Sequence, residues 1–170
     1  MENGIILDGT IGVSAGAVFG CNYQTGQIGR TLRYNLRFCN DKRYMGARVL
    51  LREGNLYSTP FCYEEVPMIH DPFDFEAYGN SPMEFWVVAT DVETGKPVYH
   101  RYEGYEDHRF DWIRASASMP LVSQIVEIEG QKLLPDYDPE AEEQPCLDVE
   151  GLLVPTEHMC RIVIVIDELA

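Results

Sequence analysis

The chain has 170 residues, a formal net charge of −15 and 45% hydrophobic residues. This length and apolar content suffice for one buried core, so we predict a single domain over residues 1–170. The charge argues against general binding to nucleic acid, because a phosphate backbone would repel the protein.

The cellular setting is predicted from apolar runs and cysteines. No apolar run is long enough to cross a bilayer, and the N-terminus lacks the basic start and apolar core of a secretion signal. The five cysteines are scattered without a C-x-x-C pair. They are Cys21, Cys39, Cys62, Cys146 and Cys160. This pattern predicts reduced thiols in a cytoplasmic protein, without a zinc site or another cofactor.

A glycine-rich turn stands near the start of the chain, between the apolar run Ile5-Ile6-Leu7 and a helix-like run over residues 17–21. Gly12, Ser14 and Gly16 form the pattern G-x-S-x-G, which is the sequence form of a nucleophile elbow after a strand. The glycines are needed because side chains two residues from the serine would collide in so tight a turn. The serine itself is expected to adopt strained backbone angles.

Such an elbow has a definite chemistry. It exposes the Ser14 hydroxyl at the end of the strand, where the helix dipole and the Ala15 N–H can stabilise an oxyanion. The alternative is a small-residue turn that packs a helix against a sheet. A phosphate-binding loop is excluded, because no Lys-Ser or Lys-Thr follows, and no G-x-G-x-x-G is present.

A basic segment follows the elbow. Ile28, Leu32 and Leu36 recur at four-residue spacing and predict an amphipathic helix over residues 28–38 with these side chains toward the core. Residues 30–52 hold seven basic side chains: Arg30, Arg33, Arg37, Lys42, Arg43, Arg48 and Arg52. Through Arg30, Arg33 and Arg37 this patch could dock anionic lipid head groups, and the alternative is a solvated helix face.

Further elements are predicted along the rest of the chain. We expect a short helix over residues 48–56, a loop region with a short helix at best over 60–82, and a hairpin of 84–91 with 97–102. Asp91, at the end of the first hairpin strand, either faces the site or caps the turn. A helix over 111–118 precedes a second hairpin around Glu129 and Gly130, within 126–134. An acidic stretch over 135–160 and a closing strand over 161–166 complete the chain.

Four segments in this order resemble the patatin-like phospholipases, in particular their bacterial cytoplasmic branch. They are IGVSAGA at residues 11–17, RYMG at 43–46, VATDVETGKPV at 88–98 and RASASMPL at 114–121. The resemblance extends over residues 1–134. It implies an α/β fold of three layers, with helices on both faces of the sheet. It also implies hydrolysis of lipid acyl esters through a Ser-Asp dyad and an acyl-enzyme, with Ser14 as nucleophile.

The chain departs from that family at both ends. It starts after the first strand and the glycine-rich oxyanion turn, so we expect a truncated sheet with an open edge beside the elbow strand. The family places its base in Asp-Gly-Gly or Asp-Gly-Ala after the strand that matches residues 132–134. Here the sequence is Pro135-Asp136-Tyr137-Asp138. Asp136 is the candidate base, with Asp138 second, and both could equally be solvated loop carboxylates.

Two other interpretations stay open. Ser14, then Asp136 or Asp148, then His158 follows the chain order of an α/β-hydrolase triad, which would make a Ser-Asp-His esterase. The chain could instead be a degenerate patatin-like fragment without hydrolase activity. The remaining histidines, His70, His100 and His108, are expected at the surface.

Overall fold

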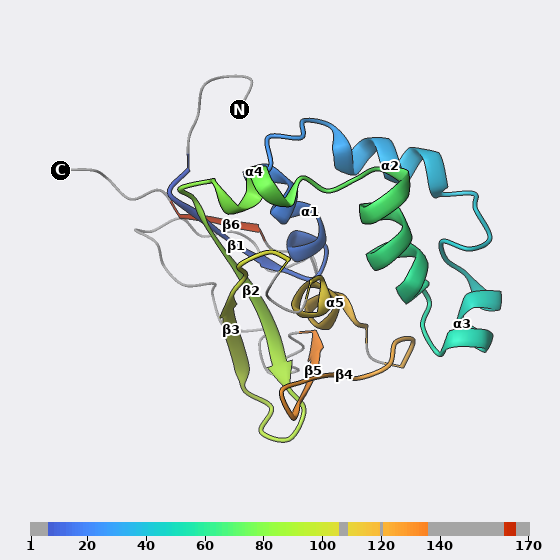
Figure 1. Cartoon of the computed structure of the whole chain (residues 1–170). Coiled ribbons are helices and arrows are strands. Elements are labelled where there is room, and N and C mark those ends of the chain that lie inside the picture. The colour runs from blue at the N-terminus through green and yellow to red at the C-terminus, as the bar shows by residue number, and fades with distance from the viewer. Residues whose placement is uncertain (1–6, 106–108, 120, 136–161, 166–170) are drawn as a thin grey trace.

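A computed structural model of the chain describes residues 7–105, 109–119, 121–135 and 162–165. Over these residues the protein has an α/β fold, in which helices pack on a six-stranded mixed sheet (Figure 1). The strands are β1 (Gly9–Val13), β2 (Glu84–Asp91), β3 (Pro97–Arg101), β4 (Val126–Ile128), β5 (Gln131–Pro135) and β6 (Ile162–Val165). The helices are α1 (Ala15–Gln24), α2 (Arg30–Phe38), α3 (Ala47–Glu53), η1 (Phe61–His70), α4 (Phe75–Gly79) and α5 (Asp111–Ala117).

Strand β2 organises the sheet, because three strands pair with it. Antiparallel β3 runs along one edge of β2, opposite its residues 86–90. The other edge is shared, since parallel β1 pairs with residues 84–88 and antiparallel β5 with residues 89–91. Val13 therefore lies opposite Val88, and Pro135 lies opposite Ala89, the next residue. The ends of β1 and β5 meet head to head on the same edge of β2.

The free side of β1 is covered. Strand β6 pairs with it antiparallel, from Gly9 opposite Val165 to Gly12 opposite Ile162. The expected open edge beside the elbow strand was therefore wrong, because the closing strand, predicted over 161–166, takes that place.

The strand before the elbow starts later than the sequence indicated. Instead of Ile5-Ile6-Leu7, the strand is Gly9–Val13, which leads into Ser14 without a linker. Leu7 is buried ahead of the strand, and Ile5 and Ile6 lie outside the described residues. A strand-to-helix corner leaves no room for intervening residues, so the paired segment must adjoin the serine.

Helices α1 and α5 contact each other and pack on one face of the sheet. Alternate side chains of β2 point into this core, where Phe85, Val87 and Ala89 are at most 1% exposed. Ala17 of α1 and Ala115 of α5 are fully buried against them, and such small side chains let both helices approach the sheet closely.

Helix α2 forms within the range predicted for it, but the face that it buries is not the predicted one. Leu32 and Leu36 are 64% and 68% exposed, and Ile28, just before the helix, is 54% exposed. The buried side chains are Arg30, Tyr34 and Phe38, which have the same four-residue spacing. The two aromatic rings join a second cluster with Tyr44, Phe61 and Val66.

Turn chemistry predicted both hairpins correctly. The β2–β3 pair and the β4–β5 pair form as expected, the latter around Glu129 and Gly130, which both adopt positive φ angles. Helices α3 and α5 also form where predicted. The interpretation of residues 60–82 as mainly loop was wrong, because η1 occupies Phe61–His70 despite Pro67 within it. Its turns are wide, and at its end the Asp71 N–H donates to the Val66 carbonyl, five residues back.

Candidate functional site

Ser14 occupies the corner between β1 and α1. Its φ of 54° and ψ of −120° place it in a backbone region that residues other than glycine rarely adopt. Such a conformation costs on the order of 1–3 kcal/mol and persists only when the surrounding structure enforces it. The strand, the strained serine and the helix thus follow one another as the G-x-S-x-G pattern predicts.

Gly12 enforces this corner by its lack of a side chain. A Cβ atom on Gly12 would lie 2.6 Å from the Gly16 carbonyl oxygen and 2.7 Å from the Ala17 nitrogen. Both contacts are with backbone of the first turn of α1, which cannot swing aside as a flexible side chain can. The start of the helix therefore lies directly on the strand, with the serine between them.

The first turn of α1 offers hydrogen-bond donors at the corner. The N–H groups of a helix's first residues have no partner within the helix, and they carry its positive dipole end. The Ala17 N–H donates to the Ser14 carbonyl at 3.0 Å. Within the described part of the chain, the N–H groups of Ala15 and Gly16 have no hydrogen-bond acceptor. These two donors can face a developing negative charge.

Ser116 of α5 is a site neighbour that sequence reasoning missed. The Ser14 N–H donates to its hydroxyl oxygen at 3.0 Å, and Ser116 is fully buried. This contact ties the strained residue to a helix from the far end of the chain. The small residues of the RASAS segment predicted close packing, but a hydrogen bond across 102 positions has no local signal.

The candidate bases lie outside the described residues. This holds for Asp136, Asp138, Asp148 and His158. The last described residue before Asp136 nevertheless lies near the corner. It is Pro135 at the end of β5, which stands one register position beyond Val13 on the same edge of β2. Among the described residues, no carboxylate or imidazole forms a hydrogen bond with the Ser14 hydroxyl.

Asp91 has a structural role. Its Oδ1 accepts hydrogen bonds from the Glu93 N–H at 3.0 Å and from the N–H and hydroxyl of Thr94 at 2.8 and 3.0 Å. These bonds hold the pKa of the Asp91 carboxyl below its ordinary value. Of the two open interpretations, turn capping is the one that the structure supports.

The described histidines and cysteines are further candidates for base or nucleophile, and their contacts argue against these roles. His100 stacks on Trp112 with ring centroids 3.9 Å apart, and His70 lies 3.5 Å from the Glu65 carboxylate. His108 is outside the described residues. Burial raises the pKa of the Cys21 and Cys62 thiols to about 12, so neither is an activated nucleophile. The described cysteines, Cys21, Cys39 and Cys62, are free.

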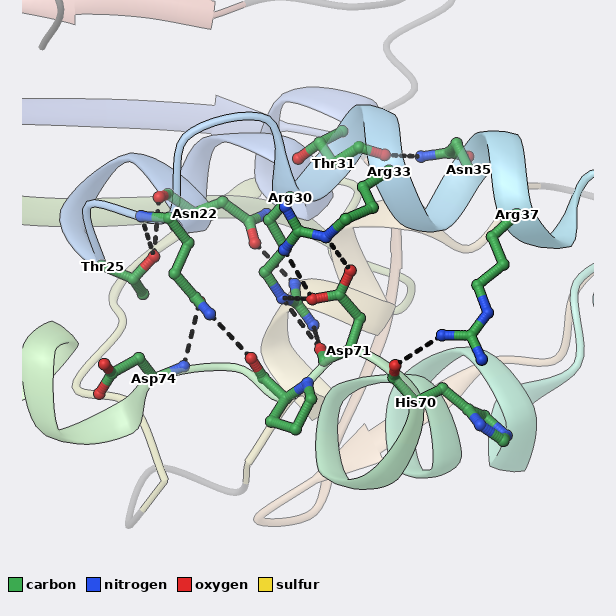
Figure 2. A network of polar contacts seen from close by, with 12 residues as sticks. Asn22, Thr25, Arg30, Thr31, Arg33, Asn35, Arg37, His70, Asp71 and Asp74 are labelled. Carbon is green, nitrogen blue, oxygen red and sulfur yellow. Dashed lines mark hydrogen bonds and ion pairs between the residues drawn. The ribbon is translucent and has the colours of Figure 1, made fainter.

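Arg30 is not available for contact with lipid, which corrects one part of the predicted basic patch. It is 4% exposed, and it donates to the Asp71 carbonyl oxygen at 3.0 Å and to Asn22 Oδ1 at 2.6 Å. Burial lowers the pKa of its guanidinium. Arg33 donates to the Asp71 carboxylate at 2.8 Å, and Arg37 donates to the His70 carbonyl oxygen at the end of η1 (Figure 2). Arg30 thus fastens α2 to α1 and to the chain after η1.

Comparisons with protein-family models and with curated proteins gave no match to this chain. None of the described helices is long and apolar enough to cross a membrane. In the described ranges, no three side chains of His, Cys, Asp or Glu gather closely enough to hold a metal ion.

Proposed function

We propose that the protein is a serine acyl hydrolase of the patatin-like type, which cleaves acyl esters of lipids through an acyl-enzyme on Ser14. The observation that carries the proposal is the strained serine at the β1–α1 corner, with free N–H groups at the start of the helix. The proposal includes the three-layer arrangement of that family, with helices on both faces of the sheet.

The proposed reaction has two steps. The Ser14 oxygen attacks the ester carbonyl carbon while a carboxylate takes its proton, and the resulting oxyanion accepts hydrogen bonds from the Ala15 and Gly16 N–H groups. Collapse of this intermediate breaks the bond to the alcohol, which leaves with the proton. A water molecule, deprotonated by the same carboxylate, then releases the acid and restores the serine.

Asp136 is the proposed base because it is bonded to Pro135, which lies one register position from the end of β1. We expect Asp136→Asn to lower kcat for a short-chain nitrophenyl ester by about a hundredfold or more, the usual contribution of a positioned base. Asp138→Asn, the matched control, should change kcat less than about threefold. Equal losses in both variants would refute this assignment, and loss in His158→Gln would indicate a Ser-Asp-His triad instead.

A second candidate is a patatin-like fragment that no longer hydrolyses esters. It is favoured by Tyr137, which stands at the place of the family's glycine. The wild-type ester assay separates the candidates, since the fragment would show no turnover above a heat-denatured sample.

We also propose that helix α2 meets an anionic lipid surface. The exposed side chains of Leu32 and Leu36 lie one turn apart on the helix, Ile28 is exposed just before it, and the exposed Arg33 and Arg37 lie beside the two leucines. Apolar side chains next to cations are the composition that inserts at the boundary of anionic head groups and acyl chains. Arg30 is not part of this surface.

Vesicle binding tests the α2 surface. Leu32→Ser with Leu36→Ser should weaken co-sedimentation with vesicles that contain phosphatidylglycerol by about tenfold or more, because each leucine buried is worth roughly 1.5–3 kcal/mol. Leu121→Ser, at a fully exposed leucine outside α2, is the control and should leave binding unchanged. Wild-type protein that stays in the supernatant would contradict the proposal.

A further inference from the structure

A hollow lined by cations lies between α3 and the loop that precedes it. It has a volume of about 130 Å³ and is lined by Lys42, Arg43, Arg48, Val49 and Arg52. Four of the chain's 13 basic side chains thus converge on one hollow, in a protein whose net charge is −15. No acidic side chain is part of the lining.

The positive charge of the hollow is only partly compensated. Arg43 pairs with the Asp41 carboxylate at 2.8 Å and with the Glu65 carboxylate at 3.6 Å, and Arg52 pairs with its neighbour Glu53. Within the described part of the chain, Lys42 and Arg48 form no ion pair. Like charges at such close range repel one another, so a bound anion would stabilise this arrangement.

The basic side chains of the hollow come from two segments, α3 and the loop before it, and both present guanidinium groups to an oxyanion. Arg48 and Arg52 are four residues apart on α3 and therefore lie one above the other on the same helix face. Val49, which is 2% exposed, anchors that helix in the protein. On the loop before α3, the Arg43 guanidinium lies over the Phe61 ring, with its central carbon 4.5 Å from the ring centroid, and it donates to the Asp41 carboxylate. Its position is therefore set before any ligand binds.

We propose that this hollow binds a phosphate-bearing anion. Guanidinium groups present forked N–H donors that match phosphate oxygens, and Lys42 adds a compact charge. The volume accommodates a phosphate group together with several water molecules. The source of the phosphate is either a small soluble compound or a head group presented by a lipid. The proposal does not depend on the chemistry at Ser14.

Titration calorimetry at low salt tests this with inorganic phosphate and diphosphate as probes. The double variant Lys42→Gln/Arg48→Gln should weaken saturable binding at least about tenfold, since both unpaired cations are removed. The matched control, Lys96→Gln/Arg101→Gln, removes the same charge from the β2–β3 hairpin and should leave the affinity within about twofold. Both pairs involve exposed side chains, and circular dichroism checks that each variant is folded.

Vesicles that contain phosphatidic acid form the second arm of the experiment. Hollow-dependent binding of the vesicles without binding of the free anions supports the proposal and identifies a lipid head group as the source. Hollow-dependent binding of the free anions supports it with a soluble ligand. Absence of saturable binding to all three probes, or equal weakening in both double variants, overturns it.

Discussion

Replacing Ser14 with alanine is expected to reduce hydrolysis of a short-chain nitrophenyl ester to the uncatalysed background, a loss of about a thousandfold or more. A methyl group cannot attack the ester carbonyl, so no acyl-enzyme forms. The fold should be unaffected, because the contact between Ser14 and Ser116 is made by the backbone N–H and not by the hydroxyl that is removed. Initial rates at saturating ester, together with a thermal melt, make the measurement.

Ser81→Ala is the matched control for this loss. Ser81 lies before β2 and accepts a hydrogen bond from the Met83 N–H at 3.3 Å, away from the β1–α1 corner. Its replacement should leave the rate within about twofold of wild type. A Ser14→Ala protein that turns over ester as fast as the Ser81→Ala protein would refute the role of Ser14.

Replacing Gly12 with alanine is expected to destabilise the protein by about 3 kcal/mol or more, which is a large effect for a single methyl group. The added Cβ would lie 2.6 Å from the Gly16 carbonyl oxygen, so the strand and the helix would have to separate at the corner. Urea denaturation monitored by tryptophan fluorescence measures the change in the free energy of unfolding.

Gly9→Ala provides the comparison on the same strand. A Cβ on Gly9 would make an ordinary contact, at 3.5 Å from the Glu84 carbonyl oxygen. Its replacement should therefore change the free energy of unfolding by less than about 1 kcal/mol. Similar losses for Gly9→Ala and Gly12→Ala would contradict the steric explanation of the corner.

Local chemistry explains why the corner and the hairpins were predictable from the sequence. Gly12 marks a close contact between β1 and the backbone of Gly16 and Ala17 that a Cβ atom would not permit, and the order of strand, serine and helix follows from it. Likewise, Glu129 and Gly130 both adopt positive φ angles, as the central residues of a two-residue type I′ hairpin turn must. These signals depend on neighbours within a few positions.

The orientation of α2 could not be predicted in the same way. Two sets of side chains recur at four-residue spacing on this helix. One set is Leu32 and Leu36, and the other is Arg30, Tyr34 and Phe38. Hydropathy favours burial of the leucines, but Arg30 is buried because Asp71, 41 positions away, and Asn22 accept its hydrogen bonds. Partners so distant in sequence leave no periodic signal.

The surroundings of Ser14 depend on distant partners too. The hydrogen bond to Ser116 and the meeting of β1 and β5 on one edge of β2 result from the register of the sheet. Strand composition predicts that the strands form, but it does not predict which residues lie opposite one another. The sequence thus identified the serine and not the neighbours that hold it.

A fluorophosphonate probe reports on the reactivity of the Ser14 hydroxyl itself. The intact mass of the folded protein should increase by one adduct, and peptide mapping should assign that adduct to Ser14. Prior heat denaturation should prevent the reaction, since the hydroxyl is activated only within the folded corner. Folded wild-type protein that acquires no adduct, or acquires it at another residue, would contradict a nucleophilic Ser14.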